Sequence, residues 1–178
     1  LSGGKLTLDP QIAWTDVRAF EDTLAAVQPV LDATPAAAHE HIVAAARSLM
    51  AAYPGALLGT EDEPWIAKPR DALRARFVRM LMRLGEALEA AGAWPAAIDV
   101  YRRFNDRFSG HIPALLRLVD ITVDAGLEQE IAEAQTRLAD AYLAEGRAAE
   151  ARVIAEDLLT RQPGDAQHVE RLRRTLVA

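Results

Sequence analysis

Apolar residues recur at spacings of three and four along most of the chain, which is the pattern of a helix that buries one face. Alanine and leucine dominate, and runs of residues that favour strands are rare. Lys5 to Leu8 is the exception, because its alternating pattern and the following Asp9-Pro10 favour one short strand or an extended lead-in. A single strand cannot form a sheet, so the pattern predicts an all-α fold.

Capping residues, glycines and prolines divide this pattern into about eight helices. We expect Asp16 to cap the first helix and Pro29 to kink or shorten its end. We expect Thr34 and Pro35 to start the second helix, and glycines to end most of the others. The predicted helices cover residues 16–32, 35–52, 64–91, 94–107, 112–125, 128–145, 148–161 and 165–177, the third of them starting at Pro64 or Pro69.

Two parts of the chain repeat one spacing of residue types. In each part a leucine is followed at once by a small residue, then by a large residue, a glycine and an alanine at the same offsets. Small residues let two antiparallel helices approach closely, and glycine adopts the left-handed turn between them. The two sets are Leu84, Gly85, Leu88, Gly92, Ala97 and Tyr101, and Leu138, Ala139, Tyr142, Gly146, Ala151, Ala155, Leu158 and Pro163.

This spacing resembles the tetratricopeptide repeat. The resemblance implies antiparallel helical hairpins that stack into a right-handed solenoid and bind a protein or peptide. The two copies start 54 residues apart, whereas the family has a period of about 34. We expect the helix at 112–125 to fill the extra length, so the array is not a plain run of identical repeats.

The predicted partner-binding residues lie on the leading helix of each copy, two and five positions on either side of the key leucine. They point away from Leu84 and Leu138, toward the concave surface that stacked hairpins form in the family. They are Arg79, Met82, Glu86 and Glu89 in the first copy and Glu133, Thr136, Asp140 and Leu143 in the second.

A second set of residues in the first part of the chain carries another resemblance. These are Gly4 to Asp9, Trp14 to Val17, Ala19 to Glu21, Tyr53 to Leu58, Trp65, Arg70, Leu73, Arg74, Leu84 and Gly85. Over residues 4–103 the chain resembles the bacterial transcriptional activator domain, a helical, tetratricopeptide-like domain that stands beside a winged-helix domain in many regulators. The resemblance implies a regulatory module for protein contacts and oligomerisation.

Two departures limit this resemblance. Lys5 to Leu8 resembles only the last strand of a winged helix, so DNA binding is not implied. After Arg103 the chain instead resembles a different bacterial tetratricopeptide protein. We interpret the chain as one helical-repeat domain with sub-blocks 1–103 and 104–178. We hypothesise that two fragments were joined near residues 101–105, by natural recombination or by design.

Composition narrows the classes of function. The 178 residues carry a formal net charge of -6, which argues against a nucleic-acid groove, and the absence of cysteine excludes thiol catalysis and disulfides. No apolar stretch approaches the roughly 20 residues of a membrane span, and the first residues lack the features of a signal peptide. We therefore expect a cytoplasmic protein that binds neither nucleic acid nor membrane.

No motif predicts an active site or a metal site. His39 and His41 point to different faces of a helix, and His111 and His168 stand alone, so all four are interpreted as solvated. The serines match no nucleophile motif. We expect no catalytic residue, no cofactor and no metal, and we predict that the chain is not an enzyme.

The segment from Lys68 to Arg83 is basic, with a net charge of +5. Arg76, Arg79 and Arg83 share one helix face, which favours a solvated stripe. The alternative is that this face pairs with an acidic partner or with the chain's own Glu-rich helices. The tryptophans are interpreted as core anchors; they are Trp14, Trp65 and Trp94.

The sequence supports two functions. The first is a non-catalytic helical-repeat scaffold that binds a protein or peptide, natural or designed. The alternative is a regulatory or oligomerisation domain of a bacterial transcriptional regulator, separated from its DNA-binding domain. Both functions are compatible with a monomer or a homodimer.

Overall fold

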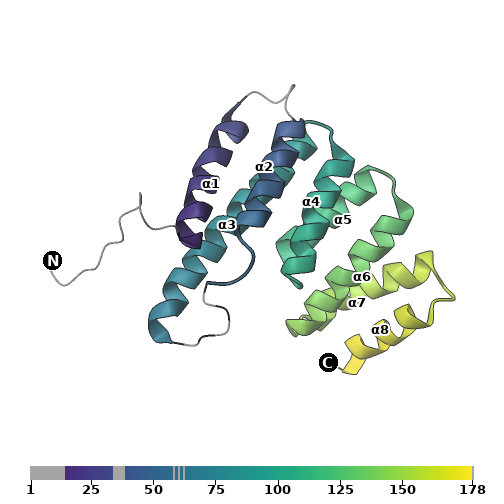
Figure 1. Ribbon diagram of the computed structural model, residues 1–178. Coiled ribbons are helices and arrows are strands. Elements are labelled where there is room, and N and C mark those ends of the chain that lie inside the picture. The colour runs from purple at the N-terminus through teal and green to yellow at the C-terminus, as the bar shows by residue number, and fades with distance from the viewer. Residues whose placement is uncertain (1–14, 34–38, 58, 60, 62, 178) are drawn as a thin grey trace, which may run out of the picture. The chain divides into compact units, whose positions relative to one another are not determined.

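A computed structural model describes residues 15–33, 39–57, 59, 61 and 63–177. Within these ranges the chain forms eight helices and no strand, which confirms the predicted all-α helical-repeat fold (Figure 1). The expected strand at Lys5 to Leu8 and the expected cap at Thr34 and Pro35 lie outside the described residues. The helices are α1 Asp16–Asp32, α2 His39–Ala52, α3 Pro64–Ala90, α4 Trp94–Arg107, α5 Ile112–Asp124, α6 Glu128–Ala144, α7 Ala148–Arg161 and α8 Ala166–Val177.

The chain divides into two compact units, Leu1–Ala87 and Leu88–Ala178. The boundary falls in the last turns of α3, so the first unit contains α1, α2 and most of α3, and the second contains α4 to α8. Each unit has its own buried apolar residues, and each is described separately below.

Helix α1 begins at Asp16, one residue earlier than a cap at Asp16 requires, so that prediction was wrong. Thr15 has extended backbone angles, and its side chain accepts a hydrogen bond from the backbone N–H of Arg18 at 3.3 Å. This is the geometry of an N-cap. Asp16 is the first helical residue, and the positive end of the helix dipole stabilises its negative charge. Pro29 lies inside α1, which continues to Asp32.

Three aromatic rings hold the first unit together. Phe20 of α1, Tyr53 just after α2 and Phe77 of α3 have ring centroids 4.6 to 6.5 Å apart, and all three side chains are buried. Aromatic pairs at these distances contribute roughly 0.5–1.5 kcal/mol beyond the burial of their area. The cluster therefore fixes α1 and the end of α2 on α3.

One of the tryptophans, Trp65, does not serve as the expected core anchor. Trp65 is 67% exposed, because the neighbouring Ile66, 2% exposed, takes the buried position in the first turn of α3. Trp94 is half-buried, and Trp14 lies outside the described residues. The core-anchor prediction was wrong for Trp65.

The two turns that contain the repeat glycines share one hydrogen-bond geometry. Gly92 and Gly146 adopt positive φ angles of 68° and 73°. In each turn the glycine N–H bonds the carbonyl three residues back, and the next N–H bonds the carbonyl five residues back, at Leu88 and Tyr142. These are Schellman motifs, which end a helix and reverse the chain. The two predicted repeat glycines therefore have the same structural role.

The helices of the second unit form two layers. On α6, Arg137 pairs with Asp106 of α4 at 2.8 Å, and Asp140 pairs with Arg171 of α8 at 3.0 Å. Helix α6 therefore lies beside both α4 and α8. Helices α5 and α7 each pack on α6, in an apolar cluster of Ile112, Leu115, Leu138, Ala141, Tyr142 and Ala151.

This arrangement shows how α5, the helix between the two repeat copies, changes the order of the layers. Because α5 lies between the two repeat copies, α4, the second helix of the first copy, shares a layer with α6, the first helix of the second copy. In a plain array, first helices share one layer and second helices share the other. The interposed α5 therefore exchanges the two layers within the second unit.

Candidate functional site

The first three predicted partner-binding residues lie on α3 in the first unit. Arg79 is exposed and lines a shallow pocket of about 330 Å³ between α1 and α3. Met82 is half-buried and Glu86 is exposed. These side chains follow one another along α3, as their spacing predicts, and their role in binding stays a prediction.

Much of the basic face of α3 pairs with α1. Arg76 donates to the Glu21 carboxylate at 2.7 Å, and Arg83 donates to the side-chain oxygen of Gln28 at 2.9 Å. All four side chains are partly exposed, so each contact contributes at most about 1 kcal/mol. For Arg76 and Arg83 the structure therefore favours pairing with the chain's own helices over an unpaired, solvated stripe.

Glu89, the fourth predicted residue of the first copy, is bonded inside the second unit. The phenol of Tyr101 donates to one carboxylate oxygen at 2.7 Å, and Arg117 donates to the other at 2.8 Å. Burial and the Glu89 carboxylate both raise the pKa of Tyr101 above its ordinary value. The Glu89 side chain is only 13% exposed, so it links α3, α4 and α5.

The predicted residues of the second copy lie along α6 with different degrees of exposure. Glu133 is exposed and lies 3.4 Å from Arg102 of α4, and Thr136 is half-buried. Asp140 accepts two hydrogen bonds from Arg171 of α8. Leu143 packs against the apolar cluster of the second unit. Glu133 is therefore the most accessible of the four, and Asp140 also holds α8 in place.

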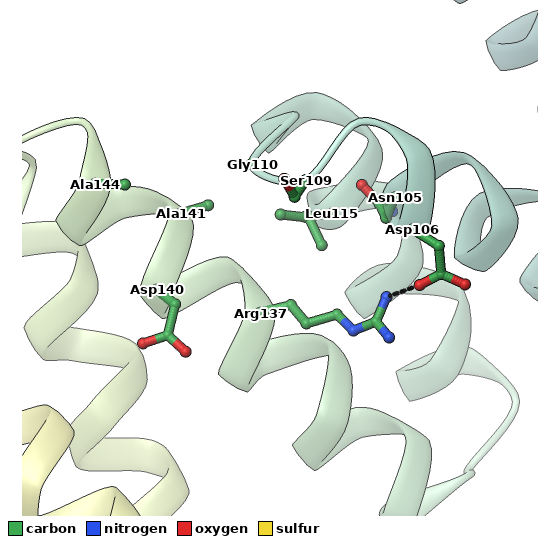
Figure 2. Close-up of a pocket in the computed structure, with 9 residues that line it drawn as sticks. All are labelled: Asn105, Asp106, Ser109, Gly110, Leu115, Arg137, Asp140, Ala141 and Ala144. Carbon is green, nitrogen blue, oxygen red and sulfur yellow. Dashed lines mark hydrogen bonds and ion pairs between the residues drawn. The ribbon is translucent and has the colours of Figure 1, made fainter. Parts of the chain in front are cut away.

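A pocket of about 470 Å³ opens between α4 and α6. Leu115, Ala141 and Ala144 give it an apolar lining, and Arg137 reaches across its edge to Asp106 (Figure 2). The remaining lining residues are Asn105, Ser109, Gly110 and Asp140. This volume lies within the range of roughly 300–1,000 Å³ that is typical of small-ligand pockets.

Sequence reasoning found one residue of this pocket, Asp140, and missed its neighbours. Arg137 and Ala144 share a helix face with Glu133, because they follow it by four and eleven residues. The small residues Ala141 and Ala144 could have indicated the pocket in the sequence, since small side chains leave space beside α4. Nothing in the sequence indicated that residues of α4 would line the pocket, because their position beside α6 depends on the exchange of layers that α5 produces.

His168 is buried at 5% exposure, so the prediction that it is solvated was wrong. Its Nε2 lies 3.0 Å from the side-chain oxygen of Gln162, and its Nδ1 lies 3.0 Å from Arg171. His168 therefore orients the arginine that binds Asp140. His39 and His41 are exposed, as predicted.

His111 is half-buried and caps α5, since its Nδ1 accepts a hydrogen bond from the N–H of Ala114 at 3.2 Å. Its role is therefore structural. Over the described ranges, no three acidic, histidine or cysteine side chains come together in a way that could hold a metal ion. The same part of the chain has no helix long and apolar enough to cross a membrane.

Comparison with known families gives one match. A tetratricopeptide repeat model matches residues 79–111 and 133–165, which contain both copies of the predicted spacing. No curated protein and no solved structure matches the chain. The match leaves α1, α2, α5 and α8 uncovered, and it does not address the resemblance to the activator domain. The chain thus has tetratricopeptide-like character in an all-α helical-repeat fold.

Proposed function

We propose that the chain is a non-catalytic scaffold that binds a segment of a partner protein over the pocket between α4 and α6. Tetratricopeptide repeats generally mediate protein–protein interactions, and the second matched segment, 133–165, contains the α6 side of this pocket. The single observation that carries the proposal is the pocket itself, which combines an apolar lining with charged groups at its rim.

The chemistry of the pocket favours a peptide with both an apolar side chain and polar groups. Leu115 and Ala141 offer an apolar wall to an inserted side chain. Arg137 and Asp106 already neutralise one another, so the rim favours hydrogen bonds over a strongly charged partner. Glu133 and Thr136 lie one to two turns before Asp140 on α6 and extend the surface. We propose that a bound segment follows α6 from the pocket toward these residues.

The test is selection of 12-residue peptides from a random library on the immobilised protein, followed by affinity measurements. Ala144→Trp fills the pocket from an exposed position, so we expect it to weaken selected peptides at least about tenfold. The matched control is Ala149→Trp, at an exposed position on α7 outside the pocket. Peptides that bind both variants equally well, or a library that yields none, would contradict the proposal.

The regulatory alternative rests on the resemblance of residues 4–103 to the activator domain. It is supported by that sequence pattern alone, as is the hypothesis of two joined fragments. A winged-helix domain encoded directly upstream in the full gene would support the regulatory function. The scaffold function is preferred because it uses the pocket that the second unit contains.

A further inference from the structure

A buried polar atom in the pocket between α4 and α6 makes no hydrogen bond to any residue that the structure describes. It is Oδ1 of Asn105, whose side chain is only 3% exposed. The Nδ2 atom of the same amide donates to the backbone carbonyl of Tyr101 at 2.9 Å. Because a carbonyl only accepts, this bond determines which end of the amide is the nitrogen. The other end of the Asn105 side chain is therefore a hydrogen-bond acceptor.

Asn105 belongs to the floor of this pocket. With Leu115, which is 1% exposed, it is among the most buried of the lining residues. Figure 2 shows the side-chain oxygen of Asn105 on the side where Leu115 and Ser109 lie. A buried acceptor without a donor is rare in folded proteins and destabilises them. A donor that entered the pocket would remove this cost.

The charged groups around the pocket are already paired within the chain. Arg137 binds Asp106 at 2.8 Å, and Asp140 binds Arg171 at 3.0 Å. An inserted ammonium or guanidinium group would therefore be buried without an opposite charge of its own, which is costly. An inserted carboxylate would place one acceptor against another at Asn105. The pocket thus favours a neutral donor.

Size and hydrogen-bonding capacity narrow the neutral donors to one side chain. The pocket has a volume of about 470 Å³ and an apolar wall of Leu115, Ala141 and Ala144, so serine and threonine would leave most of it empty. The amides, the neutral imidazole and the phenol bring acceptors of their own, which would need further donors. The indole of tryptophan has a large apolar area and one N–H group that only donates. It matches both the wall and the unpartnered acceptor.

We propose that this pocket binds a tryptophan of the partner segment, whose indole N–H donates a hydrogen bond to Oδ1 of Asn105. This assignment rests on the proposed function, because it names the side chain that the partner inserts into the same pocket. Asn105 is then the residue that determines which side chain is accepted. Leu115 and Ala141 contribute the apolar contact with the ring.

The experiment compares two peptides on the native protein. A peptide selected from the random library, and weakened by Ala144→Trp, is synthesised once with its tryptophan and once with 3-benzothienylalanine. In this analogue sulfur replaces the N–H group and the ring keeps its shape. We expect the analogue to raise the dissociation constant at least about fivefold, because the donor is lost. Equal affinities, or pocket-dependent peptides without tryptophan, overturn the assignment.

Two variants test whether Asn105 is the acceptor. Asn105→Leu keeps the approximate size of the side chain and removes the acceptor, so the two peptides should bind it within about twofold of one another. Ser109→Ala is the matched control at another polar position of the lining and should keep the preference for tryptophan. Circular dichroism checks that both variants fold, and the comparison on the native protein needs neither. A preference that survives Asn105→Leu overturns the role of Asn105.

The tryptophan assignment and the proposed function fail in different ways. If Ala144→Trp leaves the affinity of every selected peptide unchanged, the pocket binds no segment and both are wrong. If Ala144→Trp weakens binding but the analogue binds as tightly as the tryptophan peptide, only the tryptophan assignment is wrong.

Discussion

The phenol of Tyr101 donates a hydrogen bond of 2.7 Å to the carboxylate of Glu89, in a position where Tyr101 is only 1% exposed. Arg117 binds the other carboxylate oxygen at 2.8 Å. Glu89 therefore satisfies groups on two other helices, α4 and α5. Glu89, which the sequence analysis predicted as a partner-binding residue, thus has a role in the stability of the fold.

Replacement of Glu89 should test this structural role. We expect Glu89→Ala to lower the free energy of unfolding by about 1–3 kcal/mol, because it leaves the buried phenol without its acceptor. Glu86→Ala removes an exposed carboxylate three residues earlier on α3 and should change stability by less than about 0.5 kcal/mol. Urea unfolding followed by circular dichroism measures both values. Equal effects would show that the Glu89 bonds contribute nothing.

The raised pKa of Tyr101 predicts a specific loss of stability in alkali. Because burial and Glu89 raise this pKa above its ordinary value of about 10, the folded state resists ionisation that the unfolded chain allows. The stabilisation is complete below pH 10 and is lost as pH rises above it. We expect the melting temperature of the native protein to fall more steeply above about pH 10 than that of Tyr101→Phe. If the melting temperatures of both proteins fell equally steeply with pH, the ionisation of Tyr101 would not be the cause of the loss.

Asp140 and Glu133 are both predicted partner-binding residues on α6, yet their contacts with other helices of the chain differ in strength. Asp140 accepts two hydrogen bonds from Arg171, whose side chain is 9% exposed. Asp140→Ala should therefore cost about 1.5–3 kcal/mol, whereas Glu133→Ala breaks one long, exposed ion pair and should cost less than about 1 kcal/mol. Thermal unfolding compares them, and a larger loss for Glu133→Ala would refute the ordering.

The turn after α6 depends on the left-handed conformation of Gly146. Its φ of 73° is strained for any residue with a side chain, although a Cβ atom there meets nothing within 4 Å. Gly146→Ala should therefore cost about 1–2 kcal/mol through backbone strain alone. Gly164→Ala is the control, because this glycine also has free space and no positive φ. A neutral Gly146→Ala would contradict the role given to this turn.

The helices were predictable because their ends carry strong local signals. The predicted bounds of α1, α4 and α7 agree with the structure, and those of α5, α6 and α8 differ by one residue at one end. Glycine and proline determine many of these ends through the backbone alone, so no knowledge of the tertiary fold is needed there. The same glycines, Gly92 and Gly146, placed the two repeat copies in register.

The errors fall where distant residues decide the outcome. Burial of His168 depends on Arg171 and Asp140, and the bond between these two joins residues 31 positions apart. The pocket depends on the contact of Arg137 with Asp106, which follows from the position of α5. Both contacts join residues that are far apart in the sequence, so the local pattern of apolar and polar residues along a helix could not reveal them. Trp65 was misplaced for another reason, since its neighbour Ile66 fills the core position.

The central claim is that a partner segment binds over the pocket between α4 and α6. The most direct measurement is a nuclear magnetic resonance titration of isotope-labelled protein with a peptide selected from the random library. We predict that the largest shifts of backbone amide signals fall at the pocket residues, among them Asn105, Ser109, Arg137 and Ala144. Shifts confined to α1 and α2, with none at these residues, would contradict the claim.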